Sequence, residues 1–162
     1  MSPLNFAVAC AVLFFVQTSF LPYFLSGHLF DLWLVVIAIG AVIIAPKDAF
    51  LLAAAGGFIQ DIVAGNFFGI HLVPYLIITF IYVKLGKEKY NKHWYISLIA
   101  VVIASVFAFL TEGMVLYLSG NSIFLTFSVV ERLFSFTLWN GIFALLIHNI
   151  LWAVKREGEP RW

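Results

Sequence analysis

The stretch WYISLIAVVIASVFAFLTEGMVLYL, residues 94–118, carries a single charged side chain, Glu112. A helix rises by about 1.5 Å per residue, so a helix of this length can cross the roughly 30 Å hydrocarbon core of a bilayer. The polar run GKEKYNKH precedes it at 86–93, and the turn-forming run SGNS follows it at 119–122. The sequence therefore predicts a membrane-spanning helix with a polar loop on each side.

The composition of the whole chain favours a membrane protein. Hydrophobic residues make up 64% of the 162 residues and charged residues 10%, against roughly 45–50% and about 25% in soluble domains. The formal net charge of +1 indicates no nucleic-acid partner, and the single cysteine, Cys10, rules out an internal disulfide and a cysteine-based metal site. We expect one membrane domain over residues 1–162 with no cofactor.

Turn-forming residues and charges divide the apolar sequence into six candidate spans. With about 20 apolar residues needed for a crossing, the expected spans are residues 4–25, 29–45, 49–65, 67–85, 94–118 and 129–154. Pro46 and Lys47 end the second span, and Gly65 ends the third. The N-terminus lacks the basic segment of a cleaved signal, so the first span is expected as a retained helix. The sequence thus predicts an all-α integral membrane protein, a six-transmembrane-helix bundle, in which the second and third spans are either full crossings or partly re-entrant.

The basic residues are distributed asymmetrically over this arrangement. Lys and Arg in short loops favour the cytoplasmic side of a membrane. One side holds eight of the nine, namely Lys47, Lys84, Lys87, Lys89, Lys92, Lys155, Arg156 and Arg161. Arg132 alone falls on the other side. The distribution predicts that the 84–93 loop and both termini are cytoplasmic.

Four charged residues lie near the outer ends of the expected spans, where ionisable groups are costly and usually paired. They are Asp61, Glu112, Glu131 and Arg132. Three carboxylates would therefore share one level of the membrane with one guanidinium. Such a cluster could bind a partner or a ligand. Alternatively, Arg132 pairs within the chain with Asp61 or Glu112, which we expect because buried polar groups are mostly satisfied locally.

Small residues form a stripe on the third span. Ala53, Gly57, Asp61 and Gly65 recur every four residues and so share one face of a helix. Small residues let another backbone approach closely. We expect this stripe to pack helices within one chain rather than to form a dimer seam, and we expect Gly69 to shape the start of the fourth span.

Other polar residues in the spans have simpler expected roles. Gln17 and Asn140 are expected to link helices through hydrogen bonds. His71 is expected to form hydrogen bonds rather than to bind a metal, because no second ligand stands at helical spacing. The sequence contains no phosphate-binding loop, zinc signature or nucleophile elbow. We therefore do not expect an enzyme.

The run GGFIQDIVAGNFFGIHLVPYLIITFIYV, residues 56–83, resembles the signature region of the rod shape-determining protein MreD family. The matching positions are Gly57-Phe58, Asp61 and Gly69, with Asp31-Leu32 before them and Leu110-Thr111-Glu112, Glu131-Arg132-Leu133 and Asn140 after them. The order and spacing of these short motifs over the whole chain carry the resemblance. Phe30 departs from the pattern, because the family often has Pro before the Asp.

The resemblance implies a non-enzymatic inner-membrane scaffold of the bacterial cell elongation machinery, needed for rod shape and lateral peptidoglycan synthesis. Its partners would be an MreC-like membrane protein, an MreB-like cytoskeleton and cell-wall synthases, within the lipid bilayer of the cytoplasmic membrane. The residues expected to bind partners or to form a structural polar cluster are Asp31, Asp61, Glu112, Glu131 and Arg132. Those expected to pack helices are Gly57, Gly65, Gly69, Gln17 and Asn140.

Two other functions stay open at this point. The family is similar in architecture to the substrate-binding subunits of energy-coupling-factor vitamin transporters, so the chain could be a solute-binding subunit. Its pocket would be lined by Gln17, Glu112 and aromatic side chains. A structural homo-oligomer joined through the small-residue stripe is the third alternative.

Overall fold

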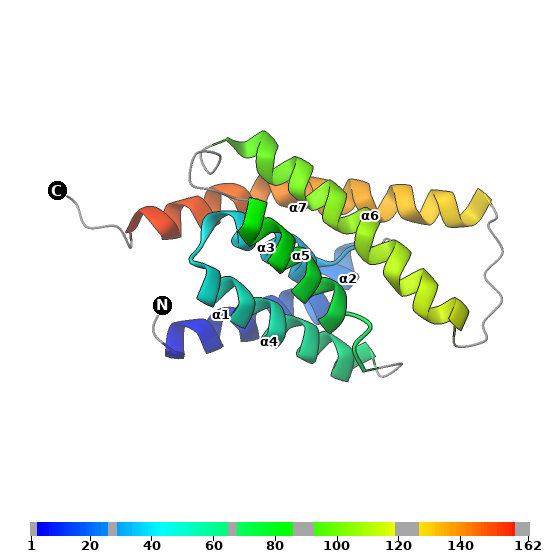
Figure 1. Ribbon diagram of the computed structural model, residues 1–162, viewed down its shortest axis with the longest axis horizontal. Helices are drawn as coiled ribbons and strands as arrows, with labels where there is room; N and C mark the ends of the chain where they lie inside the picture. Colours follow the sequence, from blue (N-terminus) through cyan, green and yellow to red (C-terminus); the bar gives the residue numbers. More distant parts are fainter. Residues whose placement is uncertain (1–2, 26–28, 65–67, 86–92, 119–126, 158–162) are drawn as a thin grey trace.

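The computed structural model describes residues 3–25, 29–64, 68–85, 93–118 and 127–157. Within these ranges every regular element of secondary structure is a helix (Figure 1). The elements are α1 (Pro3–Phe15), the π-helical turn η1 (Val16–Phe20), α2 (Leu21–Phe24), α3 (Leu32–Ile43), α4 (Pro46–Ala64), α5 (Leu72–Leu85), α6 (Trp94–Leu118) and α7 (Phe127–Glu157). The prediction of an all-α fold is confirmed for this part of the chain.

Two helices are long and apolar enough to cross a membrane. The candidate segments are Trp94–Val115 in α6 and Ser128–Leu151 in α7. Only 28% of the residues in each hydrophobic window are buried inside the molecule. Large apolar side chains are therefore displayed outward, among them Ile99, Ile103 and Leu146. This arrangement suits helices that contact lipid.

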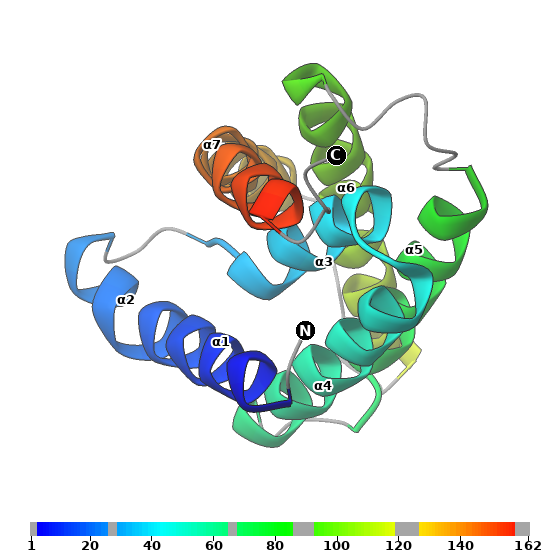
Figure 2. The same ribbon diagram turned by 90° about the vertical axis from the view of Figure 1, so that its left-hand side faces the viewer.

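The short helix α3 lies in the middle of the bundle (Figure 2). All twelve of its residues are buried, and it packs against α4, α5, α6 and α7. A helix that is apolar on every side is stable only inside a protein core or a membrane. Twelve residues rise by only about 18 Å, less than the roughly 30 Å hydrocarbon core. The expected span over residues 29–45 thus contains a shorter helix, and protein rather than lipid surrounds it.

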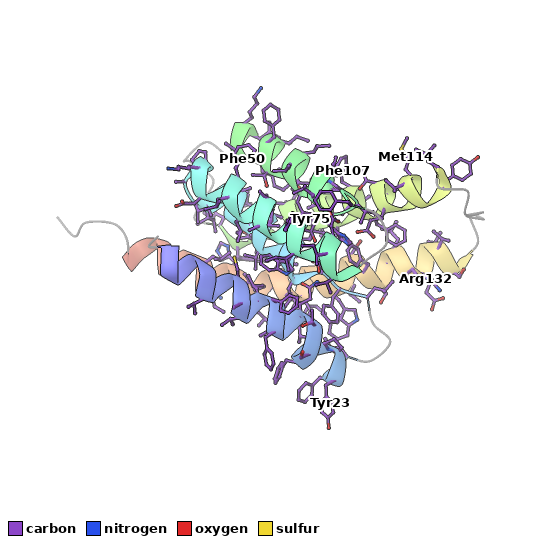
Figure 3. All side chains as sticks on the ribbon, turned by 90° about the horizontal axis from the view of Figure 1, so that it is seen from below. Tyr23, Phe50, Tyr75, Phe107, Met114 and Arg132 are labelled. Atoms are coloured by element: carbon purple, nitrogen blue, oxygen red, sulfur yellow. The ribbon has the colours of Figure 1, made fainter. Side chains whose placement is uncertain are left out.

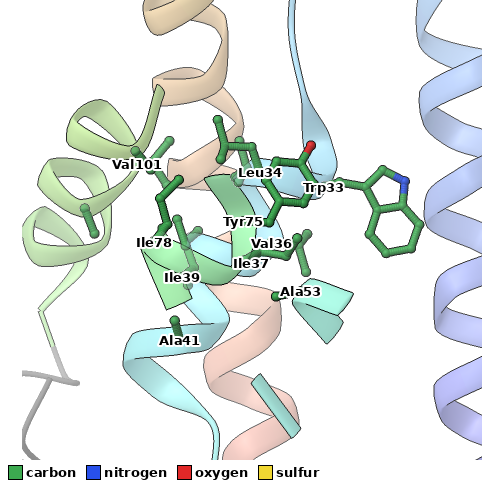
Figure 4. Close-up of a cluster of buried hydrophobic side chains, with 14 of the residues drawn as sticks. Trp33, Leu34, Val36, Ile37, Ile39, Ala41, Ala53, Tyr75, Ile78 and Val101 are labelled. Carbon is green, nitrogen blue, oxygen red and sulfur yellow. The ribbon is translucent and has the colours of Figure 1, made fainter. Parts of the chain in front are cut away.

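Large side chains of α3 form the core together with small residues of its neighbours (Figure 4). Trp33 is fully buried, and a Cβ placed on Gly56 of α4 would lie 2.6 Å from its ring. Gly56 therefore lets α4 rest directly on the indole. Ala53 of α4 and Val101 of α6 are also fully buried against this core. Close packing of this kind is typical of membrane helices with small residues at their contacts.

The ends of the helices form two distinct ends of the bundle. In Figure 1, α1, α4 and α6 begin at the left, where α3, α5 and α7 end. The exposed side chains of Lys47 and Lys84 belong to this end, since Lys47 starts α4 and Lys84 ends α5. Arg132 lies near the opposite end of α7 (Figure 3). We call these the lysine end and the Arg132 end.

The first helical segment stands partly apart from the other helices. α1, η1 and α2 follow one another without a break and lie beside α3 and α7 (Figure 2). An apolar groove of about 610 Å³ separates them, with Val12, Val36 and Ile147 among its lining residues. The compact part of the molecule is therefore formed by α3 to α7.

Candidate functional site

Asp31 is the centre of a buried hydrogen-bond network. It is the N-cap residue of α3, and only 4% of it is exposed. Its Oδ1 accepts hydrogen bonds from the backbone N–H of Leu34 at 3.2 Å, from Gln60 Nε2 at 3.3 Å and from Gln17 Nε2 at 3.4 Å. Its Oδ2 accepts one from the hydroxyl of Tyr75. One carboxylate thus joins η1, α3, α4 and α5.

Asn140 and Gln17 extend this network to the backbone at the start of α3. The backbone N–H of Asp31 donates to Asn140 Oδ1 at 2.8 Å, and that of Trp33 donates to Gln17 Oε1 at 3.1 Å. Asn140 Nδ2 donates to Ser105 Oγ of α6 at 3.0 Å. Gln17 and Asn140 therefore link helices through hydrogen bonds, as expected. They also satisfy N–H groups that a helix leaves unpaired at its first turn.

Asp61, near the end of α4, caps the start of a different helix. Its Oδ2 accepts from the backbone N–H groups of Gly69 at 2.7 Å and Leu72 at 3.3 Å. Its Oδ1 accepts from the backbone N–H of His71 at 2.8 Å, and His71 Nδ1 lies 3.0 Å away. A carboxylate at a helix N-terminus also interacts favourably with the helix dipole. Asp61 thereby fixes the turn before α5 against α4.

Two glycines make this contact between α4 and α5 feasible. A Cβ on Gly57 would lie 2.5 Å from the Cα of Leu72, so only glycine allows the two backbones to come this close. Gly69 has φ +102°, a conformation that side-chain-bearing residues rarely adopt. Ala53, Gly57 and Asp61 of the small-residue stripe thus face the interior of this chain. Gly65, the fourth member, lies outside the described residues.

His71 connects this cap to Glu112 of α6. An ionised carboxylate can only accept, so beside an ionised Asp61 the Nδ1 of His71 is the donor. His71 Nε2 then faces the Glu112 Oε1 at 3.7 Å, which is too long for a hydrogen bond. Among the described residues this is the closest polar contact of the Glu112 carboxylate. The side chain of Glu112 is 30% exposed, whereas that of Asp61 is 0% exposed.

A cavity of about 200 Å³ lies where the two networks meet. It is lined by Leu29, Phe30, Asp31, Gln60, His71, Phe109, Glu112 and Phe136. The two carboxylates differ, because Asp31 accepts hydrogen bonds from several donors, whereas in the described part of the chain none is donated to Glu112. Three phenylalanine rings form most of the remaining wall. This cavity, with Glu112 and His71 on its surface, is the candidate functional site.

Glu131 and Arg132 do not take part in this arrangement. Both side chains are exposed on α7, and Figure 3 shows Arg132 near its end. The prediction that Arg132 pairs with Asp61 or Glu112 is wrong for the described structure. Asp61 instead takes its partners from the turn before α5, where backbone N–H groups converge on it.

Several residues of the site were not expected from the sequence. Gln60, Tyr75, Ser105, Phe109 and Phe136 either complete the Asp31 network or line the cavity. Their side-chain types are ordinary in a membrane helix, so only their spatial convergence reveals them. His148, near the other end of α7, is buried and lies 2.8 Å from Ser97 Oγ through its Nδ1. It belongs to a separate contact between α6 and α7.

No protein-family model matches the chain, and no curated protein or solved structure matches it at a significant level. The interpretation of the cavity therefore rests on its geometry and on the sequence motifs.

Proposed function

We propose that the chain is an MreD-like, non-enzymatic scaffold of the bacterial cell elongation machinery, embedded in the cytoplasmic membrane. It would act with an MreC-like membrane protein, an MreB-like cytoskeleton and cell-wall synthases. One observation carries the proposal: five of the motif residues behind the resemblance, scattered along the sequence, lie in or beside one cavity, namely Asp31, Asp61, Gly69, Glu112 and Asn140, while Glu131 and Arg132 lie apart from it. Asp31 and Asn140, for example, are 109 residues apart and share a hydrogen bond.

Each of the converging motif residues has a distinct place. Asp31 and Glu112 line the cavity, and Asn140 holds the backbone of Asp31. Asp61 and Gly69 form the cap that orients His71 toward the cavity. The convergence of these residues supports a shared site.

We further propose six crossings with both termini in the cytoplasm. The alternating directions of the helices put the exposed Lys47 and Lys84 at one end, which agrees with the positive-inside rule. The short α3 suits a crossing whose first part is non-helical. Irregular backbone at membrane depth is tolerated only where protein groups satisfy it. Gln17 and Asn140 do so for the N–H groups of Trp33 and Asp31.

A solute-binding transporter subunit is the second candidate, because Glu112 and aromatic rings line the cavity as that function requires. Two features count against it. The cavity of about 200 Å³ is smaller than the roughly 300–1,000 Å³ of small-molecule sites. Gln17, expected in the transporter pocket, instead bonds to Asp31 and to the backbone of Trp33.

Depletion of the protein in its own bacterium tests the function. We expect rods to become round and an MreC-like protein to co-purify with the chain from native membranes. Cells that keep their shape but require a vitamin, with an ATPase module co-purifying, would establish the transporter function instead.

Reporter fusions test the topology separately. A reporter active only in the cytoplasm is fused after Glu88 or after Asn121, two loop positions outside the described residues. Six crossings predict a signal at Glu88 and none at Asn121. Equal signals, or the reverse order, would rule out the proposed topology.

A further inference from the structure

We propose that the cavity binds one cationic group, an alkylammonium or a guanidinium, presented by a lysine or arginine side chain of a partner protein, with Glu112 as its counter-ion. This inference rests on the proposed scaffold function and specifies the chemistry of the contact. Four features of the cavity support it: the charge around it, its hydrogen-bonding geometry, the residues that line it and its size.

Acidic residues outnumber basic ones around the cavity. Asp31 and Glu112 line it, Asp61 contacts His71 on its surface, and His71 is the only described residue in contact with these three that can carry a positive charge. Even a protonated His71 would leave negative charge in excess. Asp31 and Asp61 each accept several hydrogen bonds, which stabilise a carboxylate. Among the described residues no such donor reaches Glu112, so an ionised Glu112 calls for an external cation.

The geometry of His71 also favours a cation. In the neutral tautomer that donates through Nδ1 to Asp61, Nε2 of His71 is an acceptor. This acceptor faces the Glu112 Oε1 at 3.7 Å. Two acceptors that face each other repel unless a donor lies beside both. An ammonium or guanidinium group offers several N–H donors and can serve both atoms at once.

The aromatic lining of the cavity also favours a cation. Phe30, Phe109 and Phe136 line the cavity beside the polar groups, and the rings of Phe109 and Phe136 are 6.2 Å apart. Aromatic rings attract cations and also accept the methylene groups of lysine and arginine. A carboxylate combined with several phenylalanines therefore selects an organic cation over an anion.

The size of the cavity favours a single side chain. The cavity of about 200 Å³ lies below the roughly 300–1,000 Å³ of sites that enclose a whole small molecule. It suits one extended side chain, which favours a partner protein over a free solute. Arg132 is the internal competitor, since it lies one helical turn before Phe136 on α7. Its exposed side chain leaves the cavity to another cation.

Binding of side-chain mimics to the purified full chain in an uncharged detergent tests the inference. The probes are butylammonium and butylguanidinium, with 1-butanol as the uncharged control and tetrabutylammonium as the oversized one. We expect the small cations alone to bind and to raise the thermal unfolding midpoint. Glu112→Gln should weaken binding by about ten- to a hundredfold, the range for losing one charged hydrogen bond. Glu131→Gln, the matched change of an exposed carboxylate, should leave binding unchanged.

Phe109→Leu keeps the test decisive if Glu112→Gln fails to fold. It retains the carboxylate and should weaken binding by a few-fold through the loss of one ring. Equal binding by wild type and either variant would overturn the inference, as would binding of 1-butanol at the same strength. Stronger binding to Arg132→Gln would show that Arg132 occupies the cavity. Spermidine binding a hundredfold more tightly than butylammonium would assign the cavity to a free polyamine.

The outcome is independent of the test of the proposed function. Absence of probe binding together with rounding on depletion would remove the cation site and leave the scaffold function intact. Probe binding together with unchanged rods on depletion would keep the cation site and remove the scaffold function.

Discussion

Asp31 and Glu112 border the same cavity, yet their carboxylates are in opposite situations. Asp31 is 4% exposed and accepts hydrogen bonds from four donors on η1, α3, α4 and α5. Glu112 has a side chain that is 30% exposed, and its closest polar contact within the described ranges is His71 at 3.7 Å. A carboxylate with all its partners inside the chain stabilises the fold, whereas one without them is available to bind. The difference separates a structural residue from a functional one within a single site.

The largest effect is expected from Asp31→Leu. The change leaves the hydroxyl of Tyr75, the amides of Gln17 and Gln60 and the N–H of Leu34 without their acceptor. At about 1–3 kcal/mol for each buried unsatisfied group, the loss should reach roughly 4 kcal/mol or more. We expect the protein to fail to accumulate in membranes, as measured by immunoblot. A normal level would contradict the role of Asp31 as the hub of the bundle.

Asp61→Leu should be the next most damaging change. It removes the cap at the start of α5 and should cost about 3 kcal/mol, partly relieved where water reaches the turn. Asp48→Leu is the matched control, because Asp48 lies at the exposed lysine end and contributes roughly 0–1 kcal/mol there. Unfolding in detergent measures both.

Addition of Arg132→Leu to Asp61→Leu separates two explanations of this loss. Arg132 is exposed and does not touch Asp61, so the double variant should be as unstable as Asp61→Leu alone. Recovery of the protein level in the double variant would instead support the ion pair between Asp61 and Arg132 that the sequence suggested.

Gly57→Ala should cost about 1–3 kcal/mol, because its Cβ would lie 2.5 Å from the Cα of Leu72. Gly113→Ala in α6 is the matched control, since a Cβ there meets nothing within 4 Å. Alanine is the better helix former, so this control should be neutral or stabilising by up to about 1 kcal/mol. Thermal unfolding of the two variants side by side gives the comparison. Equal midpoints would show that α4 and α5 do not depend on close backbone contact.

The sequence predicted the helices better than their surroundings. The apolar length of residues 94–118 coincides with α6, because charges and turn-formers mark its ends. Residues 29–45 were expected as one membrane span, and within them α3 has twelve residues and is enclosed by four helices. Lipid and a protein core are both apolar, so hydrophobicity alone does not distinguish the two environments.

The site was predictable in its charged members but not in their partners. Asp61 and Glu112 stand out because carboxylates are costly in a membrane. The sequence suggested Arg132 as the partner of Asp61, since opposite charges at one level attract. The observed donors are the N–H groups of Gly69, His71 and Leu72. Every residue but proline has a backbone N–H group. Which of these groups reach Asp61 depends on where the next helix begins, and residue types alone do not show this.

Complementation of depleted cells with Glu112→Gln tests whether the cavity is the functional site. The readouts are protein level and cell shape. Glu112 has no hydrogen bond to lose among the described residues, so we expect a stability change within about 0.5 kcal/mol and a normal protein level. We expect these cells to be round, because the carboxylate that meets the partner is absent. Glu131→Gln should give normal levels and rods. If Glu112→Gln accumulates normally and restores rods as well as wild type does, the assignment of the cavity as the functional site is contradicted.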